Sequence, residues 1–171
     1  MVSGYITTRA ARRGVVTSSP SVPLRAPDRA GYYYVACDEE TGTIFAASAS
    51  CEVDAWEWDS ARAMLVKRTE DFARSLHAAC GKGHNFRPLA VVPASGGLPR
   101  CLLVGEHYTP KLRVLQLPDC ALLGEMALGG DPKVTGLAAD PSGASIAVFD
   151  NPGGAVRVLP WPLPGLELVP R

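Results

Sequence analysis

The sequence predicts an all-β fold, namely an incomplete or small β-propeller of about three four-stranded antiparallel blades with one short inserted helix. One apolar hairpin pattern occurs three times, and each copy follows a second segment that reads as strand, turn and strand. The copies begin 59 and 44 residues apart. Repeats of about 40 to 50 residues that each hold several short strands are typical of propeller blades.

The three hairpins start at Glu52, Lys111 and Ala155. Their apolar positions align in three sets: Val53 with Leu112 and Val156, Ala55 with Val114 and Val158, and Trp58 with Leu117 and Trp161. Alternation with a period of two is typical of strands that place one face on a core. We therefore expect the equivalent residues Trp58 and Trp161 both to be buried between adjacent units.

The segments before the hairpins complete the units. The turn lies at residues 39–42 in the first unit, at 93–99 in the second and at 141–143 in the third, and all three turns are rich in glycine, proline or acidic residues. Asp38 and Asp140 precede the first and third turns, where an Asp side chain can bond the backbone two residues on. We place the units at about 31–70, 86–128 and 133–169, within one repeat domain that spans 31–171.

Residues 1–30 differ from the repeats. The first 27 of them contain four arginines and no acidic residue, and they lack a continuous apolar stretch. We expect an arm that is partly disordered or contributes one strand. The alternative is an organelle transit peptide, which has a similar Arg-rich, acid-poor composition. The expected location is accordingly the cytoplasm, with an organelle as the alternative.

The stretch from Ser60 to Gly81 admits a strand and a helix. Repeat logic makes residues 63–68 the fourth strand of the first unit. Apolar residues at helical spacing then predict a short helix over Glu70–Cys80, inserted between two units and able to lay its apolar face on the propeller.

Closure of the ring is the open question. The smallest closed propellers have four blades, whereas 171 residues supply between three and four. We expect a fragment or incomplete propeller; closure by a partner or second copy, or a fourth blade from the N-terminal residues, are the alternatives. The outward faces of the first and third units, lined by Tyr33, Val35, Ile146 and Val148, are expected to stay open. Self-association, binding of a partner protein through open blade edges, or poor solubility would follow.

Composition excludes some classes of partner. Lys and Arg total 17 and Asp and Glu total 17, so there is no basic excess to attract nucleic acid or an anionic membrane. No apolar stretch approaches the roughly 18 residues of a membrane span. The five cysteines are odd in number and form no CxxC pair, so they are expected to be buried, reduced thiols.

Two dipeptides carry a resemblance to WD-repeat proteins. Gly83-His84 precedes an expected strand, as the Gly-His pair does in those repeats, and Trp58-Asp59 ends a third strand, as the Trp-Asp pair does. The third unit, from Asp140 to Trp161, is also similar to the strand passage that WD, NHL and YVTN-type propellers share. The resemblance implies a propeller that binds other proteins.

Three groups of residues are candidate sites. His77, Cys80 and His84 have metal-ligand spacing but lack a fourth ligand, and Glu106, His107 and Tyr108 fall in one loop. The carboxylates and amide at strand ends are Asp38, Asp140, Asp150 and Asn151. We favour structural roles for all of them and expect no catalytic, cofactor or metal residue.

The expected function is therefore a non-enzymatic protein-interaction scaffold built from WD-like repeats. The alternative is a lactonase-like or other hydrolytic propeller enzyme, which would hold a divalent metal or an acid–base cluster in a central channel. In that case the strand-end residues Asp38, Asp140, Asp150 and Asn151 would be the candidates. Because a blade is a scaffold that hosts many functions, the fold alone does not decide between them.

Overall fold

The computed structural model describes residues 31–48, 52–80, 88–106, 110–128, 133–151 and 154–169, and the backbone of four short strands nearer the N-terminus. Those four strands form two antiparallel pairs, β1 with β4 and β2 with β3. Their bounds are β1 Tyr5–Ile6, β2 Arg9–Arg12, β3 Val15–Ser18 and β4 Val22–Pro23. The N-terminal arm therefore contributes short strands, paired with one another.

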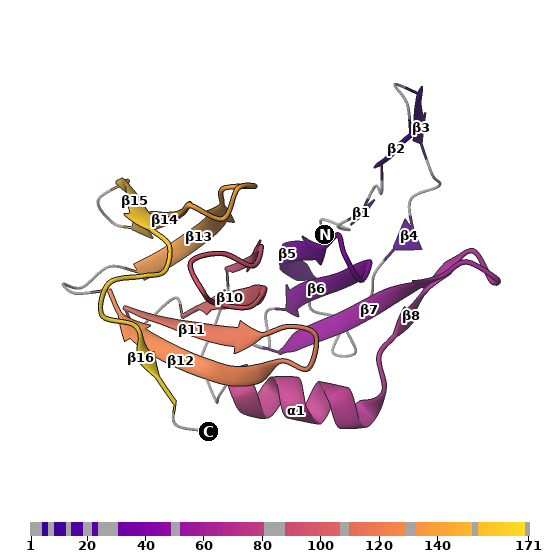
Figure 1. Cartoon of the computed structure of the whole chain (residues 1–171). Coiled ribbons are helices and arrows are strands. Elements are labelled where there is room, and N and C mark those ends of the chain that lie inside the picture. Colours follow the sequence, from indigo (N-terminus) through magenta and orange to yellow (C-terminus); the bar gives the residue numbers. More distant parts are fainter. Residues whose placement is uncertain are drawn as a thin grey trace.

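The remaining strands form three antiparallel sheets, which confirms the all-β expectation (Figure 1). The first sheet has the order β5 (Tyr32–Asp38), β6 (Thr43–Ser48), β7 (Val53–Asp59) and β8 (Met64–Lys67). The second has the order β16 (Glu167–Leu168), β12 (Ala121–Ala127), β11 (Lys111–Gln116), β10 (Cys101–Gly105) and β9 (Leu89–Val92). The third consists of β13 (Lys133–Ala139), β14 (Ser145–Asn151) and β15 (Val156–Pro160).

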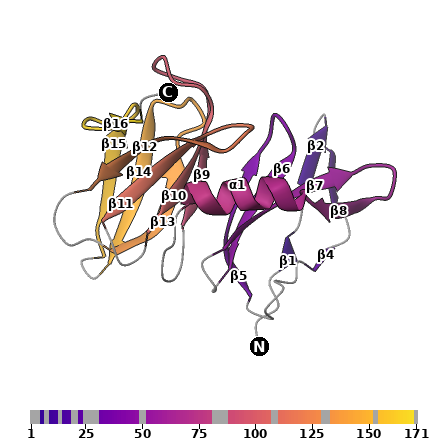
Figure 2. The same cartoon turned by 90° about the horizontal axis from the view of Figure 1, so that it is seen from below.

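One helix, α1, spans Glu70–Cys80, as the sequence predicts. Thr69 caps its first turn, since the Thr69 hydroxyl accepts a hydrogen bond from the Phe72 amide at 3.4 Å. At the other end Arg113 donates to the Ala79 carbonyl at 3.2 Å. A cation at this position also interacts favourably with the negative end of the helix dipole. The helix lies against β7 and β12, so it connects the first sheet to the second (Figures 1 and 2).

Strand pairing confirms the alignment of the three units. Residues Thr43, Cys101 and Ser145, at the starts of their strands, pair with Glu57, Gln116 and Pro160 respectively. The residue that follows Glu57, Gln116 or Pro160 is the third aligned apolar position of its hairpin, namely Trp58, Leu117 or Trp161. The backbone of the second and third units agrees further, because Leu117 donates to Arg100 at 2.9 Å and Trp161 donates to Ala144 at 3.0 Å.

The last strand departs from the repeat. Instead of closing the third sheet, β16 pairs with β12 of the second, with Gly124 opposite Leu168. A Cβ on Gly124 would lie 2.5 Å from the Glu167 carbonyl oxygen, so the glycine permits this approach. The sheets therefore hold four, five and three strands rather than four each.

The innermost strands β5, β9 and β13 lie beside one another, as those of successive blades do. A hydrogen bond from the Tyr34 hydroxyl to the Thr135 carbonyl, 2.8 Å long, joins the first unit directly to the third. Two hydrophobic cores fill the space between the sheets. The first core includes α1 and lies between the first and second sheets, and the second lies between the second and third sheets.

The expectation that both tryptophans are buried is correct for one of them. Trp161 is 6% exposed and belongs to the second core, whereas Trp58 is 43% exposed. The difference lies in where the strand ends. The chain turns after Gln116 and after Pro160, but β7 continues to Asp59 and pairs Trp58 with Leu65. Trp58 therefore points to the face opposite Glu57, away from the second sheet.

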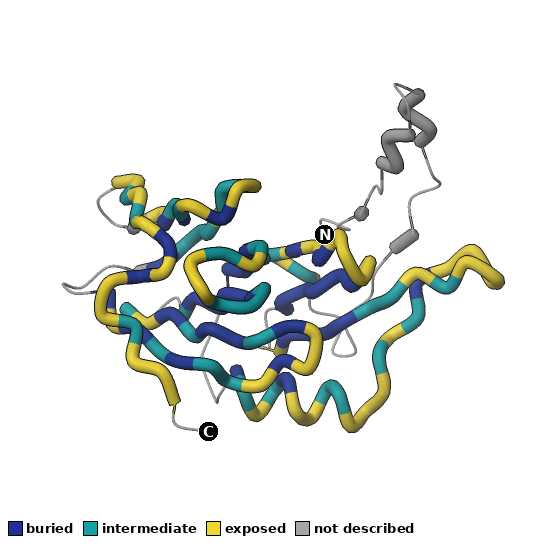
Figure 3. The backbone as a smooth tube through the Cα atoms, in the orientation of Figure 1, coloured by how far each residue is buried: buried dark blue, intermediate teal, exposed yellow. Residues whose placement is uncertain are grey.

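The outward faces also differ in part from expectation (Figure 3). Tyr33 and Val35 are exposed, as expected for the first unit, but Ile146 and Val148 are fully buried in the second core. Residues that alternate with them along the third sheet point outward instead: Phe149, Val156 and Val158 are all exposed. The aligned positions Val53 and Leu112 face the following unit, and within the described part of the chain no unit follows the third.

Candidate functional site

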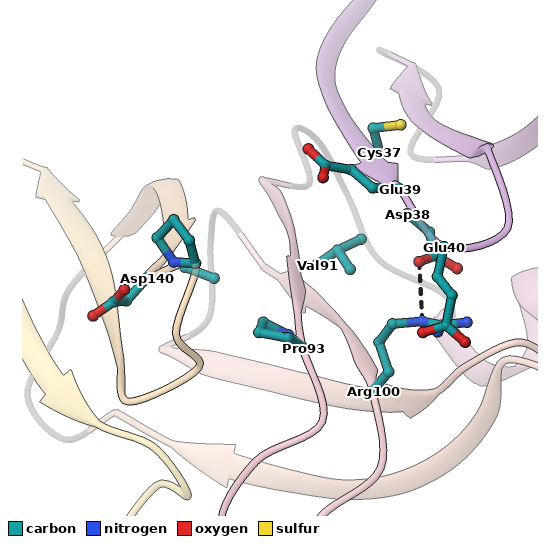
Figure 4. Close-up of a pocket in the computed structure, with 10 residues that line it drawn as sticks. Cys37, Asp38, Glu39, Glu40, Val91, Pro93, Arg100 and Asp140 are labelled. Carbon is teal, nitrogen blue, oxygen red and sulfur yellow. Dashed lines mark ion pairs between the residues drawn. The ribbon is translucent and has the colours of Figure 1, made fainter. Parts of the chain in front are cut away.

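A cavity of about 340 Å³ lies where the turns of the three units come together (Figure 4). Its walls come from the ends of the innermost strands β5, β9 and β13 and from the turns that follow them. The lining residues are Cys37, Asp38, Glu39, Glu40, Val91, Pro93, Arg100, Ala139, Asp140 and Pro141. Asp38 and Asp140, two of the strand-end candidates from the sequence, therefore lie at one cavity.

Arg100 is the basic residue in that lining. Its Nε lies 2.9 Å from Asp38 Oδ1, and its guanidinium also pairs with Glu40. The Asp38 side chain is 2% exposed and the Arg100 side chain 14% exposed. The other Asp38 oxygen, Oδ2, accepts a hydrogen bond from the Thr41 hydroxyl at 2.6 Å. Asp38 is thus neutralised and positioned by its neighbours.

Asp140 has the role expected of an Asp ahead of a turn. Its Oδ1 accepts a hydrogen bond from the Ser142 amide two residues on, at 2.9 Å. Gly143, with a φ of 70°, completes the turn in a conformation that glycine adopts readily. The same local bond was expected of Asp38, which instead bonds the Thr41 side chain and the distant Arg100.

Cys37 is the nucleophilic group of the cavity, and its surroundings make it a poor one. Burial, followed by the neighbouring charges of Glu39 and Asp38, raises the pKa of the Cys37 thiol. A thiol with a raised pKa stays protonated near neutral pH, and the protonated form is neither a good nucleophile nor a metal ligand.

Asp150 and Asn151 do not join this cavity. They pair with Val134 and Lys133, at the end of β14 that is remote from the 141–143 turn. Within the third unit, the strand-end residues suggested by the sequence therefore divide between opposite ends of the sheet, with Asp140 at the cavity and Asp150 and Asn151 at the other end.

The two histidine motifs are also divided. His77 is half-buried on α1 and Cys80 is buried in the first core, while His84 lies outside the described residues. Glu106 lies 3.1 Å from the Nε of Arg113, which also contacts Glu125 at 2.9 Å, and His107 and Tyr108 lie outside the described residues. No cluster able to hold a metal ion occurs among the residues that the structure describes.

A second charged cluster lies on the outward face of the first sheet, and the only pattern that indicated this face from the sequence was strand alternation. Asp54 is fully buried, and its carboxylate accepts a hydrogen bond from the Tyr32 hydroxyl at 2.5 Å and lies 2.6 Å from Lys67 Nζ. The Lys67 ammonium is also 6.0 Å from the centre of the Trp56 ring. Opposite charges on the neighbouring strands β7 and β8 thus balance each other within the sheet.

Most of the described cysteines match expectation. Cys80, Cys101 and Cys120 are buried and carry thiols rather than disulfides, while Cys37 is exposed and Cys51 lies outside the described residues. Burial raises the pKa of Cys101 to about 11. Burial, together with the nearby Cys80, raises that of Cys120 to about 12.

Comparison with known proteins gives little. No family model matches the chain, and no curated protein matches it. Among solved structures, the chain is similar to a protein from Lactobacillus plantarum, with 16% sequence identity and a TM-score of 0.47. The match covers 92% of this chain and 48% of the other, so the chain spans about half the length of that structure. In the described residues, α1 is too short and too polar to cross a membrane.

Proposed function

We propose that this chain is a non-enzymatic protein-interaction scaffold built from WD-like repeats, and that a partner protein docks on the hairpin formed by β7 and β8. The observation that carries the proposal is the exposure of Trp58, at 43%, near the tip of that hairpin. Met64, which lies opposite Asp59 on the neighbouring strand, is 46% exposed on the other face of the hairpin. Figure 1 shows the hairpin projecting from the body of the protein.

Physical chemistry supports a binding role for this hairpin. Leaving an indole in water forgoes the stabilisation that its burial would give, which is of the order of 2 to 3 kcal/mol for a large apolar side chain. Tryptophan and methionine are enriched in protein interfaces, and tryptophan is prominent among the residues whose truncation weakens binding most. Asp59 holds the turn, since its Oδ1 accepts bonds from the Ala61 and Arg62 amides at 2.9 and 3.1 Å. The hairpin therefore presents Trp58 on an ordered support.

The cavity between the turns favours the scaffold over the hydrolytic alternative. Its most buried carboxylate, Asp38, is held by Arg100 and Thr41, and Asp140 is occupied by its own turn. A general base needs a carboxylate that can take a proton from a substrate. We propose that Asp38 and Arg100 fix the positions of the units relative to one another.

We further propose that the protein works in the cytoplasm. The buried thiols of Cys80, Cys101 and Cys120 are reduced, as in a reducing compartment. The equal numbers of basic and acidic residues give no attraction for nucleic acid or anionic membranes.

The test compares wild type with Trp58→Ala in affinity capture from extracts of the source cells, followed by titration calorimetry with each purified partner. We expect at least one partner whose affinity falls ten- to hundredfold in Trp58→Ala, as for an interface hot spot of about 2 kcal/mol. Arg74→Ala, on the exposed side of α1, is the matched control and should bind as wild type does. Equal affinities for Trp58→Ala and wild type would refute the docking site. Hydrolysis of lactones or esters that Asp140→Asn abolishes would favour the enzyme instead.

A further inference from the structure

The three sheets differ in how their outer edges end. The first sheet ends in β8, which is four residues long, ends at Lys67 and is followed by Arg68. The second ends in β16, which has two residues. The third ends in β15, which has five residues and exposes Val156 and Val158. Short strands and charged side chains protect sheet edges from pairing with other chains. β15 is the least protected of the three edge strands, because it is the longest and has the lowest share of charged residues.

The hydrogen-bonding groups of β15 alternate in direction. Trp161 donates to Ala144 across the pair with β14, so in an antiparallel ladder Leu159 and Arg157 also face β14. The amides and carbonyls of Val156 and Val158 therefore point away from β14. No strand in the described part of the chain pairs with that side of β15.

The outward face next to this edge is apolar and uncharged. Phe149 is 43% exposed, Val156 54% and Val158 68%, and register places Phe149 opposite Val156. The one charged residue of β15, Arg157, points to the other face and donates to the Leu128 carbonyl at 3.1 Å. The edge and the face beside it thus combine open backbone groups with apolar side chains.

We propose that β15 pairs with β15 of a second copy of this chain, antiparallel across a two-fold axis, to form one continuous six-stranded sheet. Identical antiparallel edges are self-complementary under a two-fold axis, so each copy offers what the other needs. An uncharged face suits this contact, because a two-fold axis brings a patch close to its own image and like charges there would repel one another. The outward face of the first sheet fits less well as the acceptor, because it holds the Asp54 and Lys67 charges and its centre is already buried.

This inference goes beyond the proposed function and uses a different surface. The scaffold proposal rests on Trp58 in the first unit, whereas the dimer rests on β15 in the third. The two tests can therefore fail independently.

The experiment is analytical ultracentrifugation of the purified chain over about two orders of magnitude in concentration, since dimer formation follows mass action. We expect the weight-average mass to rise from one chain to two. Val158→Pro removes an amide proton that points away from β14, so it should keep the sheet and shift the dissociation constant at least tenfold. Val158→Thr keeps that amide and the β-branched shape, and it should dimerise within about threefold of wild type.

Hydrogen exchange of the wild-type chain provides an independent readout. The Val156 and Val158 amides should become protected as concentration rises, while the Leu159 amide, already bonded to β14, should change little. A wild-type mass of one chain at all concentrations would overturn the proposal. The proposal would also be overturned if Val158→Pro dimerised with the same dissociation constant as wild type. Exchange rates of the Val156 and Val158 amides that do not depend on concentration would overturn it as well.

Discussion

The hydroxyl of Tyr34 donates to the carbonyl of Thr135 at 2.8 Å, a bond that joins two residues 101 positions apart. Tyr34 lies on the innermost strand of the first unit and Thr135 on that of the third. The units therefore converge on a common centre, and the second unit does not separate the other two completely. Partial burial raises the pKa of Tyr34, which keeps the donating proton in place.

Replacing Tyr34 by Phe should remove this bond and little else. We expect a loss of about 1 kcal/mol in the free energy of unfolding, the usual net contribution of a part-buried hydrogen bond. The orphaned Thr135 carbonyl can be reached by water, so a larger loss is not expected. Urea unfolding followed by circular dichroism measures the change. A midpoint equal to that of wild type would show that the first and third units do not depend on this contact.

The pair of Asp38 and Arg100 predicts a second effect on stability. Arg100→Met should leave the buried Asp38 carboxylate without its cation, at a cost of about 3 to 5 kcal/mol. Asp38→Asn combined with Arg100→Met should recover much of that loss, because neither charge then remains buried alone. Arg62→Met is the control, since Arg62 is 70% exposed in its pair with Asp59 and should cost less than about 1 kcal/mol. Additive losses in the double variant would argue that the two residues act separately.

The elements of the fold were largely predictable from local signals. Alternation of apolar residues predicts the strands of all three units, and helical spacing of apolar residues predicts α1 at its observed bounds. The register of the aligned hairpins also follows from the sequence, because a slip of one residue would exchange the two faces of a strand.

Features that depend on distant residues were not predictable. The partner of β16 depends on the space above Gly124, which a two-residue strand does not encode. Arg100 gave no signal, since an arginine at the end of a turn is usually solvated, and its pairing with Asp38 exists only in the folded chain. The expected burial of Trp58 is wrong because equivalence in the repeat does not determine where β7 ends.

The two aligned tryptophans should therefore respond differently to truncation. Trp161→Ala should lower the free energy of unfolding by about 3 to 5 kcal/mol, because it removes a large side chain from the second core. Trp58→Ala should cost less than about 1.5 kcal/mol, because the ring is already largely in water. Urea titrations of both variants measure this difference. In Trp161→Ala combined with Trp56→Phe, which leaves Trp58 as the one tryptophan, acrylamide should quench the fluorescence readily; a shielded Trp58 would contradict the structure.

Alkaline pH should destabilise the fold through its buried thiols. The folded pKa of Cys101 is about 11 against an ordinary value of 9.0, and its thiol donates to the Pro99 carbonyl at 3.0 Å. Because the folded pKa is the higher one, the folded chain holds this proton more tightly than the unfolded chain does. The contribution is therefore complete below pH 9 and is lost as the pH rises from about 9 to about 11, by roughly 2 to 3 kcal/mol.

Cys101→Ala tests this assignment, since it removes the titrating group at the cost of a small cavity. We expect the variant to be about 1 kcal/mol less stable than wild type at neutral pH, because it loses one buried hydrogen bond and the contacts of the sulfur. Its stability should then fall less steeply between pH 9 and pH 11, so that the difference from wild type shrinks or reverses. Cys120, whose pKa is about 12, should add its effect at still higher pH. Urea unfolding at a series of pH values gives the slopes, and parallel slopes for wild type and Cys101→Ala would show that the Cys101 thiol is not the titrating group.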